Sequence, residues 1–242
     1  MTKNKKHDLE NNLIIKIKNI DLKLKNKFFF KDLSLNIQNN GITFLLGPNG
    51  SGKSLCLKLI AGLVKPDRGK IEFYSKKTIK IGYVSQKTVF LRRNVFDNLK
   101  FTLRIMNYPK NKISATIKKI LSIANFEKYS NVSARNLSIG QQQLLSVLRA
   151  LIIKPNILLL DEPCSNLDPQ TTKKIEDILL SIKKTEIKII IVTHDLLQVK
   201  RLADDVFFIN NGVILENSRK NIFFNNPKSK SVMNYINGNL LN

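Results

Sequence analysis

The sequence predicts an α/β fold in which helices cover a parallel β-sheet. One observation is an apolar run at 42–46 that is followed by a glycine-rich turn and by a segment of helical period at 54–62. A second is that the short apolar runs 157–160 and 187–192 lie between helical segments, as buried parallel strands do. A length of 242 residues suits one domain, so we expect a single domain over residues 1–242.

An N-terminal antiparallel β subdomain is expected before the glycine-rich turn. The runs 13–17 and 28–30 are rich in β-branched and aromatic residues, which is typical of strands. The helical segment after the turn is expected to stop near Lys65 and Pro66, because proline cannot continue a helix.

An inserted α-helical subdomain is expected at residues 86–149. Apolar side chains recur three and four positions apart between 113 and 124, which indicates an amphipathic helix. The remaining core would then consist of residues 1–85 and 150–242.

The chain is strongly basic, with 41 Lys and Arg against 18 Asp and Glu, a formal net charge of +23 and a pI near 10.0. Such a charge can indicate a nucleic acid or an anionic membrane surface as partner. Lysine, however, far outnumbers arginine, and lysine, asparagine and isoleucine share A/T-rich codons. The high lysine content, and with it the charge, therefore partly reflects the bias of an A/T-rich genome. Scattered lysines usually form a solvated surface.

No apolar run approaches the roughly 18 to 20 residues that cross a bilayer. Residues 1–12 are polar and lack the apolar stretch of a secretory leader, so we expect neither a membrane span nor a leader. The two cysteines, Cys56 and Cys164, have no metal-ligand or CxxC spacing, and we interpret them as small buried thiols of a protein in a reducing compartment.

A phosphate-binding loop is predicted at residues 47–54, which fit the pattern G-x-x-x-x-G-K-S/T. The loop consists of Gly47, Pro48, Asn49, Gly50, Ser51, Gly52, Lys53 and Ser54. Glycines let successive N–H groups converge on phosphates at the positive end of the following helix. Lys53 adds a point charge, and the Ser54 hydroxyl is a hard oxygen ligand for Mg²⁺.

Two adjacent carboxylates, Asp161 and Glu162, follow the apolar run 157–160. In a buried parallel sheet this places them at the carboxyl edge, where ligands bind. We expect Asp161 to hold Mg²⁺ and Glu162 to orient or deprotonate the water that attacks the γ-phosphate. Taken alone, the pair could equally belong to an exposed turn.

The run 187–192 brings His194 to the same edge, where an imidazole could bond the γ-phosphate. Gln86 follows the apolar run 81–84, and its amide could touch both Mg²⁺ and water. A lone histidine is more often structural, and Gln86 by itself is a weak signal.

A second anion-binding helix end is expected at Leu137, Ser138, Ile139, Gly140 and Gln141, just before a helix predicted at 142–153. It lies in the helical insertion, so we do not expect one chain to close both this helix end and its own phosphate loop on one nucleotide. This favours a head-to-tail dimer in which each ATP lies between the loop of one chain and this helix end of the other.

The order of these motifs resembles the nucleotide-binding subunit of ABC transporters over nearly the whole chain. The resemblance implies an ABC-type ATPase core of the P-loop NTPase class, with ATP and Mg²⁺ as cofactors. It also implies the following correspondences: residues 47–54 are the Walker A loop, Gln86 the Q-loop, Ser138 to Gln141 the signature, Asp161 and Glu162 Walker B, Asp168 the D-loop and His194 the switch histidine.

The chain departs from the family pattern at three positions. Ile139 occupies the position where the signature usually has its first glycine, and this replacement should stiffen the turn. Leu144 stands where relatives often carry arginine. Leu24 aligns with the aromatic residue that stacks on adenine, and Phe28 could replace it only in a different strand register.

The C-terminal segment 201–238 is similar to subunits of oxyanion importers, first of tungstate or molybdate systems and then of phosphate systems. The implied partners are a second copy of the chain, a membrane permease and, indirectly, an extracytoplasmic binding protein; no nucleic acid is expected. The implied location is the cytoplasmic face of the cell membrane. A permease helix would dock near residues 86–101, at Phe90, Leu91 and Phe96, although each of these could equally be a core residue.

Two alternatives stay open. The first is a subunit of an ABC exporter for lipid, haem or drug. The second is a nucleic-acid-associated ABC-type ATPase, which would need a long coiled coil between the phosphate loop and the signature. The interval between residues 54 and 137 is too short for one.

Overall fold

The computed structural model describes residues 13–25, 27–39, 41–75 and 78–238. The chain forms two compact units, the first from Met1–Ile79 with Lys188–Asn242 and the second from Lys80–Ile187. The expectation about a leader concerns residues 1–12, which lie outside the described residues. The division into residues 1–85 with 150–242 and 86–149 stays a prediction.

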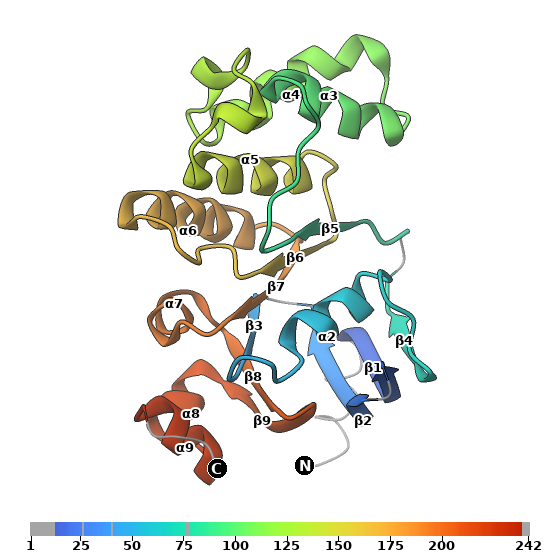
Figure 1. Ribbon diagram of the computed structural model, residues 1–242, viewed down its shortest axis with the longest axis vertical. Coiled ribbons are helices and arrows are strands. Elements are labelled where there is room, and N and C mark those ends of the chain that lie inside the picture. The colour runs from blue at the N-terminus through green and yellow to red at the C-terminus, as the bar shows by residue number, and fades with distance from the viewer. Residues whose placement is uncertain (1–12, 26, 40, 76–77, 239–242) are drawn as a thin grey trace. The chain divides into compact units, whose positions relative to one another are not determined.

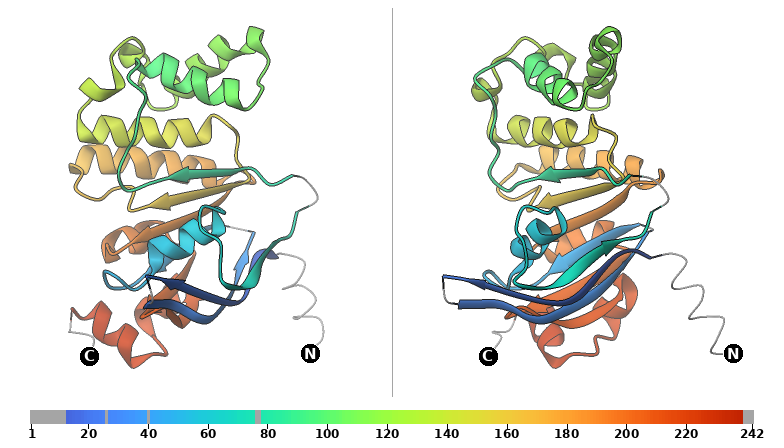
Figure 2. Two further views of the ribbon diagram at one scale, coloured as in Figure 1. Left: turned by 45° about the vertical axis from the view of Figure 1, so that its right-hand side comes forward. Right: turned by 90° about the vertical axis from the view of Figure 1, so that its right-hand side faces the viewer.

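The first unit contains an antiparallel sheet, as expected for the N-terminal part. It consists of β1 (Leu13–Leu24), β2 (Lys27–Gln38) and β4 (Arg68–Phe73), in the order β2-β1-β4. The strands β1 and β2 run side by side as a long hairpin (Figure 2). They extend well beyond the short apolar runs, because ladder hydrogen bonds continue through polar positions whose side chains face solvent.

The first unit also holds the strands that carry the phosphate loop. β3 (Ile42–Leu46) pairs in parallel with β7 (Lys188–Thr193) on one side and with β8 (Asp205–Asn210) on the other. β9 (Val213–Arg219) pairs antiparallel with β8. Every residue of β3 and β7 is buried, which explains why these strands are continuous apolar runs rather than alternating ones.

The helices of the first unit are α2 (Lys53–Ile60), α7 (Leu196–Leu202), α8 (Lys220–Asn225) and α9 (Lys230–Ile236). α2 buries an apolar side that includes Cys56, which is 0% exposed. α8 and α9 lie together near the C-terminus and contact β9 (Figure 1). Phe208 of β8 packs against Phe223 and Tyr235, with ring centroids 6.3 and 5.0 Å away, and so fastens both helices to the strand.

The second unit pairs two parallel strands and carries the expected helices. β5 (Ile81–Val84) lies in parallel with β6 (Ile157–Asp161). The helices are α3 (Val95–Ile105), α4 (Ile113–Ser122), α5 (Ile139–Leu151) and α6 (Pro169–Lys183), with short 3₁₀ turns η1 (Lys110–Lys112), η2 (Glu127–Tyr129) and η3 (Ala134–Asn136). α5 and α6 run side by side, and α5 also contacts β5, α3 and α4 (Figure 1). Among the described residues, no helix is long and apolar enough to cross a membrane.

Candidate active site

The phosphate loop joins β3 to α2, and close packing on its neighbours demands glycine at two positions. A Cβ at Gly47 would lie 2.0 Å from the Ile209 carbonyl oxygen, and a Cβ at Gly52 would lie 2.8 Å from the Phe30 ring. The loop thus lies directly on β8 and β2. A side chain at either glycine would push the loop away from these strands.

Gly52 is the N-cap of α2 and provides no side-chain acceptor for the first N–H groups of the helix. Those groups remain at the positive end of the helix dipole, which suits an anionic ligand. The hydroxyl-bearing Ser54 lies in this first turn and is half-buried.

Lys53 folds back on the loop in which it stands. Its Nζ donates to the carbonyl oxygens of Gly47 and Pro48, each at 2.8 Å, and the residue is 6% exposed. A phosphate that approaches the loop therefore meets an ammonium group already held at the site. Two of the three N–H donors of this ammonium point at carbonyl oxygens of the loop itself.

His194 lies beside the loop strand at the same edge of the sheet. The register pairs Leu46, which precedes Gly47, with Thr193, which precedes His194. Thr193 is buried, and His194 is exposed. The Tyr235 hydroxyl lies 3.4 Å from the carbonyl oxygens of both Gly47 and His194, so α9 contacts the loop and the histidine segment together.

Asp161 and Glu162 stand at the end of β6 in the second unit. Asp161 is 4% exposed, and the Tyr83 hydroxyl donates to its Oδ2 at 3.4 Å. Burial, together with the negative Asp161, raises the pKa of Tyr83 to about 12, so the phenol stays protonated as a donor. Glu162 is 9% exposed and has a φ of 51°, a left-handed conformation that non-glycine residues rarely adopt outside constrained sites.

The predicted signature residues form the start of α5, three residues before the helix start predicted from the sequence. Ser138 is the N-cap and forms a capping box with Gln141, in which the Gln141 N–H donates to Ser138 Oγ at 3.3 Å and the Ser138 N–H donates to Gln141 Oε1 at 3.0 Å. The N–H groups of Ile139 and Gly140 remain at the helix start. Ile139 is 75% exposed, whereas Leu137 is buried.

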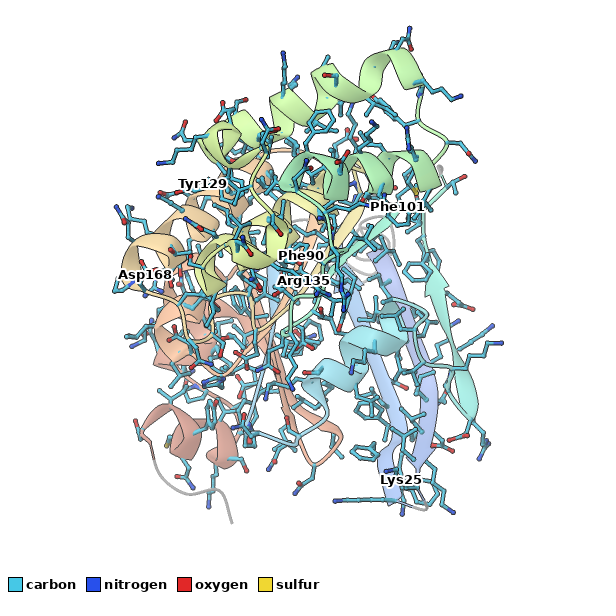
Figure 3. The ribbon with its side chains drawn as sticks, turned by 45° about the horizontal axis from the view of Figure 1, so that its top comes forward. Lys25, Phe90, Phe101, Tyr129, Arg135 and Asp168 are labelled. Atoms are coloured by element: carbon cyan, nitrogen blue, oxygen red, sulfur yellow. The ribbon has the colours of Figure 1, made fainter. Side chains whose placement is uncertain are left out.

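Gly140 brings the signature against α6. A Cβ at Gly140 would lie 2.9 Å from Thr171 Cγ2. Asp168 caps α6 by accepting from the Thr171 N–H at 2.9 Å, and hydrogen bonds from Thr171 lower the pKa of the Asp168 carboxyl. Thr171 therefore lies next to both Gly140 of the predicted signature and Asp168 of the predicted D-loop (Asp168 is labelled in Figure 3).

The structure places the other positions that depart from the family pattern as follows. Leu144 is buried in α5. Leu24 is 39% exposed and pairs with Lys27, and Phe28 is 48% exposed and pairs with Lys23. The ammonium groups of Lys23 and Lys31 lie 5.5 and 4.7 Å from the Phe28 ring centroid.

A groove of about 400 Å³ lies in the second unit, on the wall formed by β5, α3 and α5. Its lining includes Tyr83, Phe90, Leu91, Phe101, Ile105 and Arg149. Phe96, which the sequence placed with Phe90 and Leu91, does not line it. The Arg149 guanidinium lies 4.8 Å from the Phe90 ring centroid and donates to the Val89 carbonyl at 2.8 Å (Phe90 and Phe101 are labelled in Figure 3).

The candidate residues divide between the two units. The phosphate loop and His194 belong to the first, whereas Gln86, the signature, Asp161, Glu162 and Asp168 belong to the second. Gln86 is exposed in the loop after β5. No sequence pattern indicated Tyr83 or Thr171, since their contacts depend on the packing of segments far apart in the chain.

Comparison with known proteins identifies the family. The sequence profile of the ABC transporter family matches residues 30–165. The chain is 38% identical to the phosphate import ATP-binding protein of Malacoplasma penetrans, over 97% of this chain and 89% of that protein. It is 34% identical to the spermidine/putrescine import ATP-binding protein of Clostridium acetobutylicum, over 97% and 69% of the two chains. It is 35% identical to the tungstate uptake ATP-binding protein of Peptoclostridium acidaminophilum, over 76% and 88%.

Solved structures agree with these relatives. A dimeric ATP-binding cassette in a post-hydrolysis state with ADP and phosphate matches with a TM-score of 0.77 and 26% identity, over 86% of this chain and 99% of that one. The subunit cbiO1 of an ABC transporter complex from Clostridium perfringens matches with a TM-score of 0.77 and 26% identity, over 89% and 92%. The chain is therefore a member of the ABC transporter family, an ATP-binding subunit that is an ATPase coupled to transport.

Proposed function

We propose that the chain is the ATP-hydrolysing subunit of an importer. The observation that carries this proposal is its identity of 34 to 38% to import ATP-binding proteins over nearly its whole length. Among substrates we favour an oxyanion such as phosphate, tungstate or molybdate. The phosphate import relative supports this choice, and so do the tungstate uptake relative and the oxyanion-importer character of residues 201–238.

Polyamine import is a second candidate, because the spermidine/putrescine relative matches over an equal share of this chain. An uptake assay separates the two. Cells carrying Glu162→Gln in place of the native gene should lose uptake of labelled phosphate, or of tungstate and molybdate measured by elemental mass spectrometry. Loss of spermidine uptake alone would favour the polyamine, and normal uptake of all these solutes with lost efflux would favour an exporter.

In the proposed mechanism, the phosphates of ATP lie against the N–H groups of the loop and of the first turn of α2. Lys53 moves from the Gly47 and Pro48 carbonyls to the phosphate oxygens. The attraction between Lys53 and the triphosphate offsets the loss of its two carbonyl bonds.

Mg²⁺ suits the donor set that the chain offers, because Ser54, Gln86 and Asp161 provide hydroxyl, amide and carboxylate oxygens. Among the described residues, no group of three His, Cys, Asp or Glu side chains forms a competing metal cluster. When bound, the ion would neutralise charge that develops on the phosphates. Ser54, Gln86 and Asp161 would hold it there.

Glu162 would accept a proton from the attacking water, and its burial limits the number of waters that reach it. His194 would form a hydrogen bond with the γ-phosphate and so couple the presence of this phosphate to the neighbouring strand β3. In a head-to-tail pair, the N–H groups at the start of α5 would contact the ATP of the partner copy, and Asp168 would lie near that interface.

The further proposed partners are a membrane permease, whose helix docks in the groove, and indirectly an extracytoplasmic binding protein. The subunit would then work at the cytoplasmic face of the membrane. Phe101→Asp would test this docking, because it places a charge in the groove. An affinity-tagged native chain should co-purify with a membrane protein, and the variant should lose that partner while its basal ATPase rate is retained.

A further inference from the structure

Tyr83 reaches from the groove to the carboxylate proposed to hold the metal. It stands on β5 opposite Leu159 of β6. Asp161 lies two residues beyond Leu159, so it shares a face of the strand with that residue. Side chains in strands lean along the strand direction, and the Tyr83 hydroxyl in this way comes within 3.4 Å of Asp161 Oδ2.

Tyr83 is also a lining residue of the groove. Ile81, Gly82 and Tyr83 form one wall, and Phe101 and Ile105 of α3 form another. Phe101 is 38% exposed and Ile105 is 64% exposed, so the groove presents apolar surface to whatever enters it. Tyr83 therefore lines the groove and also bonds Asp161.

The aromatic ring of Tyr83 is a rigid connection between the groove and the Asp161 carboxylate. Tyrosine has only two side-chain torsions before its hydroxyl, so a shift of the ring at the groove moves the oxygen at the carboxylate. Asp161 is 4% exposed, which leaves little room for water to replace a lost donor.

We propose that Tyr83 is a positioning residue that holds the Asp161 carboxylate and transmits occupancy of the groove to it. This inference rests on the proposed function, in that the occupant would be an apolar helix of the permease and Asp161 would hold the metal. A permease helix that presses on the ring would thereby change how well the site binds Mg²⁺.

The first test measures metal affinity rather than turnover. Tyr83→Phe keeps the ring and removes the hydroxyl, and Tyr129→Phe is the matched control, since Tyr129 packs on Phe126 in the same unit. Binding of a non-hydrolysable ATP analogue is followed by calorimetry over a range of Mg²⁺ concentrations. We expect the half-saturating Mg²⁺ concentration to rise about threefold in Tyr83→Phe, with unchanged binding in EDTA. The same Mg²⁺ dependence in both variants and the native chain would overturn the proposal.

The second test follows Tyr83 itself. The chain has five tyrosines, so 3-fluorotyrosine gives a simple ¹⁹F spectrum in which Tyr83→Phe identifies the Tyr83 signal by its loss. That signal should shift in Asp161→Asn and in Ile105→Trp, which fills the groove with a larger side chain, while the Tyr129 signal stays in place. A Tyr83 signal that stays in place in either variant would overturn the proposed link between the groove, Tyr83 and Asp161.

These tests separate the inference from the proposed function. Both use the isolated subunit and need no permease or solute. Failed uptake assays would therefore leave the Tyr83 measurements interpretable, and failed Tyr83 measurements would leave the importer assignment in place.

Discussion

At the scale of single residues, the side chain of Lys53 donates two hydrogen bonds within the phosphate loop itself. The two bonds from Lys53 to the Gly47 and Pro48 carbonyls fix the loop in shape. Removal of the ammonium has two effects at once: the phosphates lose a charge, and two carbonyls lose a donor.

Lys53→Ala should weaken binding of an ATP analogue by about tenfold or more, as expected for a lost hydrogen bond to a charged group. Calorimetry with the purified chain measures this. Lys58→Ala is the matched control, because Lys58 is exposed on the same helix. Normal affinity in Lys53→Ala would refute the assignment of the phosphate loop.

Glu162→Gln keeps the size of the side chain and removes its ability to accept a proton. We expect ATP binding and dimer formation to persist while turnover falls by about 100-fold or more. Phosphate release and size-exclusion chromatography with ATP measure the two properties, with the exposed Glu186→Gln as control. A turnover near that of the native chain would exclude Glu162 as the base.

At the scale of elements, the buried strands were predictable to within one residue at either end. The runs 157–160 and 187–192 became β6 and β7, because burial on both faces requires continuous apolar sequence. β4 was not predicted, since none of its six residues is fully buried and its sequence is mostly polar. The helix start at Ile139 was also missed, because the capping box of Ser138 and Gln141 begins the helix earlier than the apolar pattern does.

The motifs of the candidate site could be found from sequence, but several contacts between elements could not. Tyr83 and Asp161 are joined only because β5 pairs with β6 in one register. Similarly, the contact of Gly140 with Thr171 depends on the packing of α5 against α6. No local periodicity encodes either contact.

The packing of α5 on α6 can be tested at Gly140. Gly140→Ala places a methyl group 2.9 Å from Thr171 Cγ2 and should destabilise the fold by about 1 kcal/mol. Thr171→Ser removes the opposing methyl group, so the same alanine should cost less in that background. Urea unfolding of the double-mutant cycle measures the coupling, and additive effects would show that the contact is unimportant.

At the scale of the whole molecule, the net charge of +23 does not correspond to any motif. Lys53 is the one basic side chain (lysine or arginine) to which the proposed mechanism gives a role. The rest of the charge is compatible with a subunit that works beneath an anionic membrane surface.

Replacing exposed lysines far from the motifs should therefore leave catalysis intact. Lys118→Glu with Lys119→Glu, both on the exposed side of α4, should keep the ATPase rate within about twofold of the native chain. A steady-state assay at two salt concentrations measures this. A large loss would make the charge itself a functional feature.

The burial of Cys56 has a practical consequence for observing the proposed pair of copies. Burial raises the pKa of this thiol to about 12, so almost none of it is thiolate near neutral pH. Cys164 is the other cysteine of the chain; it was expected to be buried, but it is only half-buried, and it lies between Glu162 and Asp168 in the sequence. A thiol-reactive spin label should consequently attach at one place in the native sequence, close to the carboxylate proposed to be catalytic. The distance between two such labels would then show whether ATP brings two copies together.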